Sequence, residues 1–182
     1  MSDKYKGRYR IESARLKNWD YGWNAAYFVT ICTHGREHYF GDIIDGRMQL
    51  SEIGHLANKY WSEIPKHFPF VELDSFVVMP NHVHGIVIIN KPNDERYVET
   101  QNFASLPSES RNKFGPQSKN LASIIRGFKI GVTKNARIIN ADFAWQSRFY
   151  DHIIRNDESL ERIRDYIINN ALRWNEDKFC NE

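Results

Sequence analysis

The sequence is short of cysteine, of long apolar runs and of excess charge of either sign, and each shortage excludes a class of protein. Its 182 residues include 2 cysteines, Cys32 and Cys180, which favours a reduced, cytoplasmic protein over a disulfide-stabilised one. Long apolar stretches of the kind that span a membrane are missing, and the first residues predict no signal peptide. The formal net charge of +2 does not by itself indicate a nucleic-acid partner, so that argument depends on where the charges lie.

The length and the mixed composition suit one domain with a substantial core. Hydrophobic residues make up 41% and charged residues 26% of the chain. We expect a single domain over 1–182, with an N-terminal extension at 1–24, a polar loop at 90–119 and a terminal helix at 156–174. A loop of that length in a compact domain is usually functional or disordered.

Hydrophobic periodicity predicts four strands and three helices. The strands are expected at 26–33, 71–79, 83–89 and within 143–154. The helices are expected at about 51–66, 119–138 and 156–174. The first six of these elements follow the β-α-β-β-α-β order of the ferredoxin-like split fold, an α+β fold. In it, two helices cover one face of a four-stranded antiparallel sheet, so the other face is available for a site or for the terminal helix.

A pair of histidines stands in the third predicted strand, in the step His82-Val83-His84. Alternate side chains of a strand point to the same face, so both imidazoles project together while Val83 points to the core. Two such imidazoles can chelate a metal ion. From the spacing alone, a metal site and a pair of ordinary core or surface histidines are equally open.

The terminal helix carries a second set of polar side chains. Tyr166 and Asn170 are four residues apart and therefore neighbours on one helix face, with Arg162 and Arg173 beside them. A phenol, an amide and two guanidinium groups suit a phosphate substrate, and a tyrosine oxygen can attack phosphorus to form a phosphotyrosine. Because a phenol ionises only near pH 10 in water, a metal or a base must assist. The ordinary interpretation is that the tyrosine packs and the asparagine caps the helix.

Two further groups of residues could contact nucleic acid. Arg126, Lys129 and Arg137 lie on the polar side of the helix predicted at 119–138, where they form either a phosphate-tracking stripe or a solvated face. The N-terminal segment carries aromatic side chains, which either stack on unpaired bases or, as we favour, cover a hydrophobic edge. These aromatic residues are Tyr9, Trp19, Tyr21 and Trp23.

Several motifs together resemble one family of DNA-processing enzymes. The run Pro80-Asn81-His82-Val83-His84-Gly85 resembles the His-hydrophobe-His motif of the HUH single-strand DNA endonucleases. From about residue 15 to residue 174, the chain resembles the IS200-like tyrosine transposases, most closely the REP-associated tyrosine transposases. The other matching segments are 26–33, 125–129, 145–156 and 166–170. One departure is Ala171, where many relatives have proline.

The resemblance implies metal-dependent cleavage and strand transfer of single-stranded hairpin DNA, such as REP-like elements or insertion-sequence ends. It implies a divalent metal, Mg²⁺ or Mn²⁺, bound by His82, His84 and Asn170, and Tyr166 as the nucleophile that forms a 5′-phosphotyrosine. It further implies a cytoplasmic, nucleoid-associated prokaryotic protein that is a monomer or a homodimer. The residues expected to contact DNA are Arg126, Lys129, Arg137, Arg162, Arg173, Tyr150, His152 and Arg155.

Three alternatives remain open at this point. Tyr150 is a rival nucleophile, followed by His152 and Arg155, but it lies in a predicted strand and no amide follows it at helical spacing. A DNA-binding protein that has lost cleavage is a second function. A related HUH replication or relaxase nuclease is a third, although those proteins usually carry further domains or a second tyrosine.

Overall fold

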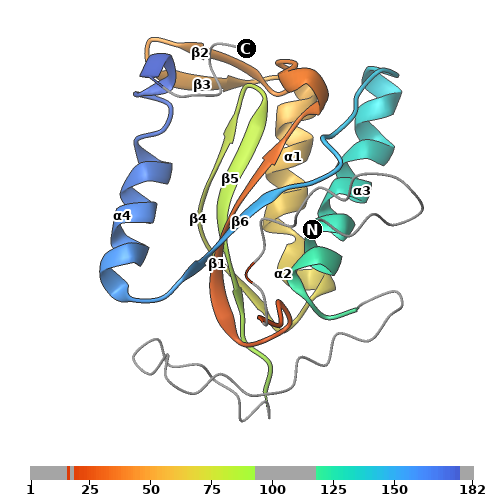
Figure 1. Ribbon diagram of the computed structural model, residues 1–182. Helices are drawn as coiled ribbons and strands as arrows, with labels where there is room; N and C mark the ends of the chain where they lie inside the picture. The colour runs from red at the N-terminus through yellow and green to blue at the C-terminus, as the bar shows by residue number, and fades with distance from the viewer. Residues whose placement is uncertain (1–15, 17–18, 93–117, 177–182) are drawn as a thin grey trace, which may run out of the picture.

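The centre of the molecule is an antiparallel sheet of four strands in the order β4-β5-β1-β6 (Figure 1). The computed structural model describes residues 16, 19–92 and 118–176. The strands are β1 (Ala25–Cys32), β4 (Val71–Met79), β5 (His82–Ile89) and β6 (Tyr150–Ile154). Placing the first and third strands of the chain order at the centre is the arrangement of the ferredoxin-like split fold, so the predicted fold class is confirmed.

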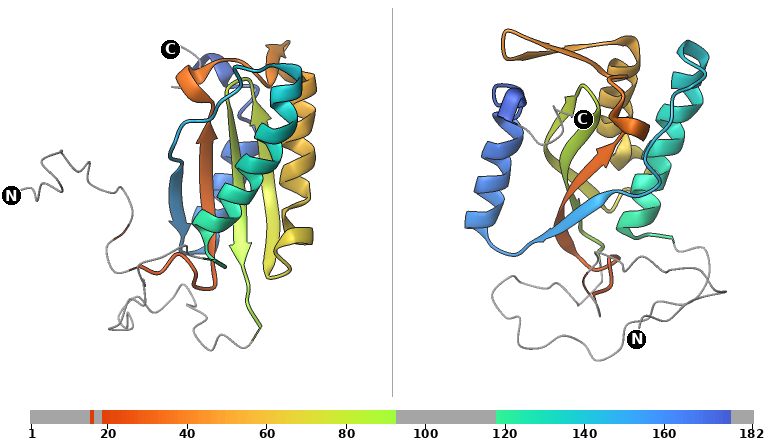
Figure 2. Two further views of the ribbon diagram at one scale, coloured as in Figure 1. Left: turned by 90° about the vertical axis from the view of Figure 1, so that its right-hand side faces the viewer. Right: turned by 45° about the horizontal axis from the view of Figure 1, so that its top comes forward.

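Helices cover both faces of this sheet. α1 and α3 lie side by side on one face, and α4 lies on the other (Figure 1, Figure 2). The helices are α1 (Glu52–Ser62), α2 (Ile64–His67), α3 (Leu121–Ile139) and α4 (Asp157–Ile168), with 3₁₀ turns η1 (His34–Arg36) and η2 (Trp174–Glu176). Within the described ranges, no helix combines the length and the apolarity needed to cross a membrane.

The helices begin where the sequence places polar caps. The Ser51 hydroxyl accepts a hydrogen bond from the Gly54 amide at 3.0 Å, and the Asn156 side chain accepts one from the Ser159 amide at 2.8 Å. α1 ends four residues earlier than expected, at Ser62, because Pro65 has no backbone N–H to continue the hydrogen bonds of that helix and stands in the first turn of the separate helix α2.

The side chains of β5 alternate between the two layers. Val83 and Val87 are buried in the core beneath α1 and α3, and Ile86 packs on the α4 side with the histidines. Gly85 is required by close approach, because a Cβ there would lie 2.2 Å from Cζ2 of Trp61. One strand therefore supplies the core with one face and the candidate site with the other.

The N-terminal aromatic residues belong to the core. Trp19, Tyr21 and Trp23 are buried in the cluster that includes Tyr27 of β1. The indole nitrogen of Trp19 donates a hydrogen bond to the Tyr27 hydroxyl at 3.2 Å. The favoured interpretation, that they cover a hydrophobic edge, is confirmed for these three residues, while Tyr9 lies outside the described residues.

A two-stranded hairpin was not anticipated from the sequence. It consists of β2 (Gly41–Ile44) and β3 (Arg47–Leu50), and it lies at the end of the molecule where β4 turns into β5 (Figure 1). Asp45 and Gly46 have φ values of 50° and 70°, as a tight two-residue hairpin turn requires. An Asp-Gly step is a strong hairpin signal, so the sequence did contain the information.

The terminal helix is shorter than predicted. α4 ends at Ile168, and Asn169 caps it with its side-chain nitrogen bonded to the Asp165 carbonyl at 2.9 Å. Asparagine side chains compete with helical backbone bonds, and two of them follow in succession here. The chain then turns, and Trp174 packs with Cys32 and Met79. Asn170 therefore lies in this turn and not on a helix face shared with Tyr166, which corrects the prediction.

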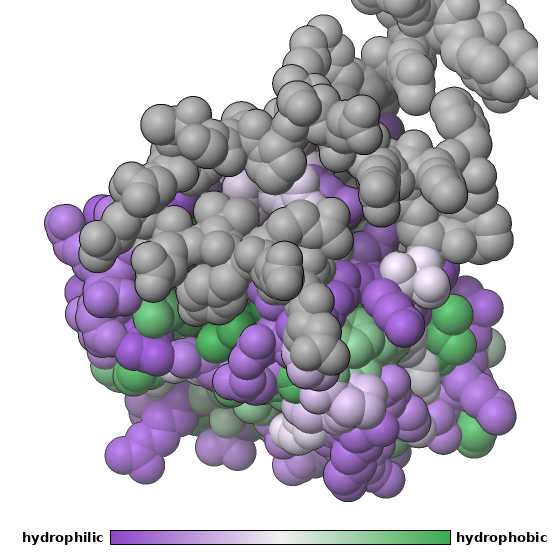
Figure 3. Space-filling view, turned by 90° about the horizontal axis from the view of Figure 1, so that it is seen from below, coloured by the Kyte–Doolittle hydropathy of each residue, from purple (hydrophilic) through white to green (hydrophobic). Residues whose placement is uncertain are grey.

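Figure 3 shows the coloured residues at the end of the molecule opposite the β2–β3 hairpin. Among the coloured residues seen from below, hydrophilic side chains predominate, and hydrophobic ones appear in small groups between them (Figure 3). The features that distinguish the molecule lie elsewhere, on the α4 side of the sheet.

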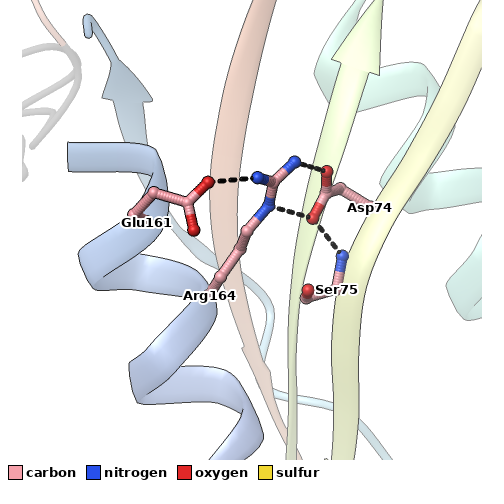
Figure 4. A network of polar contacts seen from close by, with 4 residues as sticks. All are labelled: Asp74, Ser75, Glu161 and Arg164. Atoms are coloured by element: carbon pink, nitrogen blue, oxygen red, sulfur yellow. Dashed lines mark hydrogen bonds and ion pairs between the residues drawn. The ribbon is translucent and has the colours of Figure 1, made fainter. Parts of the chain in front are cut away.

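An ion pair joins α4 to the sheet. The guanidinium of Arg164 donates two hydrogen bonds to Asp74 of β4, at 2.9 and 2.6 Å, and a third to Glu161 of its own helix at 2.5 Å (Figure 4). The Ser75 amide also donates to Asp74 Oδ1, at 2.6 Å. Asp74 and Ser75 form a bulge, because the pairing shifts between Leu73 and Phe76. These hydrogen bonds, chiefly those from Arg164, lower the pKa of Asp74 to about 2.

This shift predicts a pH-dependent contribution to stability. The folded pKa of Asp74 lies below the ordinary value of 3.8, so the stabilisation is present above pH 4 and is lost as the pH falls towards about 2. Asp74→Asn should lower the free energy of unfolding by about 1–2 kcal/mol at pH 6, after allowance for solvent screening. The difference from the wild type should shrink between pH 4 and pH 2.5 in urea titrations.

A matched charge loss provides the control. Asp165→Asn removes an exposed carboxylate from the same helix. It should stay within about 0.5 kcal/mol of the wild type at every pH. A wild-type to Asp74→Asn difference that does not change with pH would contradict the assignment.

Candidate functional site

His82 and His84 lie next to each other at the start of β5, on the face that α4 covers. Their ring centroids are 4.3 Å apart. The exposed fractions are 0% for His82 and 1% for His84, so both imidazoles are removed from bulk water. Burial of two adjacent imidazoles is costly unless their nitrogens have defined partners, so the hydrogen bonds they make decide what the pair can do.

The Nδ1 atom of each histidine is held by an oxygen of the protein. His82 Nδ1 lies 2.8 Å from Asn81 Oδ1, and His84 Nδ1 lies 2.8 Å from the Thr30 hydroxyl. An amide oxygen can only accept, so His82 Nδ1 carries the proton and Nε2 carries the lone pair. The Thr30 hydroxyl can accept in the same way. Metal-binding histidines are typically oriented by such a bond on the second nitrogen.

Tyr166 meets this pair within a single chain. Its hydroxyl lies 3.1 Å from His84 Nε2, although the two residues are 82 positions apart in the sequence. Phe28 of β1 stacks on the His84 ring at 5.3 Å and meets the Tyr166 ring edge-on at 6.1 Å. With 38% of its surface exposed, Tyr166 is open to a substrate while its ring contacts those of Phe28 and His84.

The turn after α4 completes the surroundings of His82. Trp174 stacks on the His82 ring with centroids 6.0 Å apart. Asn170 is 2% exposed and lies in the chain between Tyr166 and Trp174, which both contact the histidines. The part of the chain that the structure describes contains no cluster of three His, Cys, Asp or Glu side chains. A cation here would therefore need the amide of Asn170, or oxygen atoms of a substrate, beside the two imidazoles.

The rival nucleophile lies on the same face but two strands away. Thr30 is paired with His84 on one side and with Tyr150 of β6 on the other. Directly paired residues point to the same face, so all three side chains form one row across the sheet. Two strand spacings separate Tyr150 from His84, about 10 Å. Tyr150 is 56% exposed at the open edge of this face, which suits contact with a substrate.

Basic side chains gather near that edge. His152 of β6 is paired with Phe28, so it also points to the α4 face. Burial lowers the pKa of His152, and the nearby guanidinium groups of Arg155 and Arg162 lower it further. The structure thus brings together three of the predicted DNA contacts, and Arg173 is exposed beyond Asn170.

The predicted basic stripe on α3 is not part of this assembly. α3 covers the opposite face of the sheet from α4 (Figure 2), so Arg126, Lys129 and Arg137 lie on the far side of the sheet from the histidine pair. Lys129 donates to the Gln146 carbonyl at 2.6 Å, and Arg137 donates to the Phe143 carbonyl at 3.0 Å. Burial lowers the pKa of Lys129 to about 8. These two residues hold the segment that leads into β6.

Sequence reasoning missed three residues of the site. Thr30 could be found only from strand register, because it stands 54 positions from His84. Asn81 was visible in the Pro-Asn-His-Val-His run, where an amide next to a histidine is a local signal. Trp174 stands at the end of the predicted terminal helix and was not among the expected site residues, yet it stacks on His82.

Comparison with known proteins agrees with this geometry. No family model matches the chain. An uncharacterized protein of Haemophilus influenzae is 39% identical over 183 residues, which cover 98% of each chain. A putative REP-associated tyrosine transposase of the same organism is 24% identical over 148 residues, covering 78% of this chain and 73% of its own.

The fold has a counterpart among solved structures. A REP-associated tyrosine transposase bound to a REP hairpin superposes with a TM-score of 0.59 at 19% identity, covering 93% of this chain and 77% of that one. At that sequence identity, the similarity shows a shared fold. The chain therefore belongs to the same family as the uncharacterized Haemophilus influenzae protein, and it is similar in sequence to the putative REP-associated tyrosine transposase of that organism and in fold to the hairpin-bound one.

Proposed function

We propose that this chain cleaves and rejoins single-stranded hairpin DNA through a covalent bond between Tyr166 and a 5′ phosphate. The observation that carries the proposal is the 3.1 Å contact between the Tyr166 hydroxyl and Nε2 of the buried His84. The relatives support it, since one is named as a putative REP-associated tyrosine transposase and a structural neighbour is bound to a REP hairpin. Tyr166 and His84 belong to one chain, so a second copy is not needed to assemble them.

The chain's own residues account for the chemistry as follows. The Tyr166 oxygen attacks the phosphorus in line, a bond forms between them, and the bond from phosphorus to the 3′ oxygen breaks. The phenol loses its proton, and the departing 3′ oxygen gains one to become a hydroxyl. His84 Nε2 lies within hydrogen-bond reach of the phenol, so the structure holds the phenol oxygen beside the nitrogen that would bind a metal. The covalent bond conserves the phosphodiester energy, so an incoming 3′ hydroxyl can reverse the reaction and join strands.

The donor set fits a divalent metal such as Mg²⁺ or Mn²⁺. Both imidazoles are fixed through Nδ1, so Nε2 of His82 and of His84 would hold the ion, with the buried amide of Asn170 as the third protein group. When bound, such an ion neutralises charge on the phosphate and assists ionisation of the phenol. Because hard ions prefer oxygen ligands, Asn170 and the DNA phosphate contribute to the choice of metal.

The DNA would approach the site over β6. Tyr150, with its exposed ring, can stack on a base, and Arg155 and Arg162 place positive charge along the same edge, where His152, with its lowered pKa, stands as a hydrogen-bonding group. Arg173 extends this surface beyond Asn170. The residues of α3 face the other way, so a strand that contacts them must pass around the sheet.

Removal of the phenol oxygen tests the nucleophile. Wild-type protein incubated with labelled hairpin DNA and Mn²⁺ should form an adduct that survives SDS electrophoresis, and Tyr166→Phe should form none. Tyr150→Phe is the matched control, since it removes a phenol from the same face without reaching His84. It should keep the adduct and weaken DNA binding by less than about tenfold.

An adduct that persists in Tyr166→Phe and disappears in Tyr150→Phe would reverse the assignment. Tight hairpin binding by the wild type without an adduct under any divalent ion would indicate a binding protein instead of a nuclease.

The orienting hydroxyl of Thr30 gives an independent test of the metal site. Thr30→Val keeps the shape of the side chain but removes the partner of His84 Nδ1. Mn²⁺ affinity, measured by calorimetry on the DNA-free protein, should fall about 10-fold to 100-fold. Thr30→Ser keeps a hydroxyl and should remain within about threefold of the wild type. Equal affinities in the wild type and Thr30→Val would exclude the orienting role.

A further inference from the structure

The contacts of α4 with the sheet are of two kinds. Leu160, Ile163 and Ile167 pack against the apolar side chains of β1, β5 and β6. Apolar contacts of this kind are not directional, so they set the rotation of the helix about its own axis less sharply than hydrogen bonds do. The ion pair of Arg164 with Asp74 is directional, because its two parallel hydrogen bonds require one orientation of both groups.

Arg164 and Tyr166 stand on opposite flanks of the apolar stripe. At about 100° per residue, they are separated by about 160° around the helix axis on the side that contains the stripe. The contacts agree, since Arg164 reaches β4 at one edge of the sheet and Tyr166 reaches His84 on β5 beside Phe28 on β1. A bond that fixes one flank therefore also fixes the other.

The size of the effect follows from the helix dimensions. Side chains extend about 5–6 Å from the axis, so a rotation of about 20° moves a side-chain atom by about 2 Å. The hydroxyl of Tyr166 lies 3.1 Å from His84 Nε2, and a displacement of that size breaks the contact. Misplacement of a reacting group by about 1 Å can cost about 100-fold in rate.

The carboxylate side of the pair is itself fixed. In the β4 bulge, Asp74 and Ser75 together stand opposite Ile86, and the Ser75 amide bonds Asp74 Oδ1 at 2.6 Å. Glu161 holds the other edge of the Arg164 guanidinium (Figure 4). Bulges often re-aim a side chain next to a functional site, and this one directs Asp74 at α4.

We propose that the Asp74–Arg164 ion pair is a positioning contact that sets the rotation of α4 and thereby holds Tyr166 against His84 of the same chain. The inference rests on the proposed function for its catalytic consequence. Its structural consequence, the contact between the phenol and the imidazole, can be measured without DNA or metal.

The first measurement is the ¹⁵N chemical shift of His84 Nε2 in the free protein. Tyr166→Phe shows the shift of the ring without the phenol contact. Asp74→Asn should move the His84 signal in the same direction and by at least half as much. Asp165→Asn, the exposed charge loss on the same helix, should leave it at the wild-type position. A wild-type shift in Asp74→Asn overturns the proposal.

The second measurement separates positioning from stability. The single-turnover rate of adduct formation should fall about 10-fold to 100-fold in Asp74→Asn, while the DNA dissociation constant stays within about twofold. Ile64→Val, a core change in α2 on the other side of the sheet, loses stability without touching α4 and should keep the wild-type rate. Equal losses of rate in Asp74→Asn and Ile64→Val would reduce the ion pair to a stabilising contact and overturn the proposal.

The two proposals fail separately. If the wild type forms no adduct at all, the proposed function fails, and the His84 shift alone decides the role of the ion pair. If the wild type forms an adduct that Tyr166→Phe abolishes, the function stands whatever Asp74→Asn does.

Discussion

The strict alternation of β5 is the constraint on which the rest of the structure depends. Val83, Gly85 and Val87 face α1 and α3, and His82 and His84 face α4. Because the period of a strand is two, a slip of one residue would turn the imidazoles towards α1 and α3 and the valines towards α4. The close approach of Trp61 to Gly85 locks this register, since no other residue of the strand leaves that space. The same register of β5 therefore satisfies the packing of the core and the placement of the histidines.

The site is assembled across the sheet rather than along the chain. Thr30 on β1 orients His84, Asn81 at the β4–β5 turn orients His82, and Tyr166 arrives from α4. Each of these groups touches a ring that is already fixed by packing. The sheet holds the two imidazoles, and α4 brings the Tyr166 phenol to them.

The sequence predicted what depends on local pattern. The same-face histidines, the four main strands and the helix starts near residues 51 and 156 follow from periodicity, and the structure has them. The features that the sequence did not predict depend on how the chain folds in three dimensions. The apolar stripe of α3 shows that the helix is covered on one side, but it does not show what its basic side chains contact, such as the Gln146 carbonyl to which Lys129 donates. The partner of His84 required strand register, which no local pattern contains.

The bulge in β4 has a consequence for how molecules of this protein meet one another. β4 is an edge strand, and edge strands expose unpaired backbone groups that can recruit another sheet. An irregular ladder with charged side chains at Glu72 and Asp74 is a poor template for such pairing. The bulge that directs the Asp74 carboxylate at α4 therefore also disfavours edge-to-edge pairing of β4 with the sheet of another molecule. A single extra residue in the strand contributes to both effects.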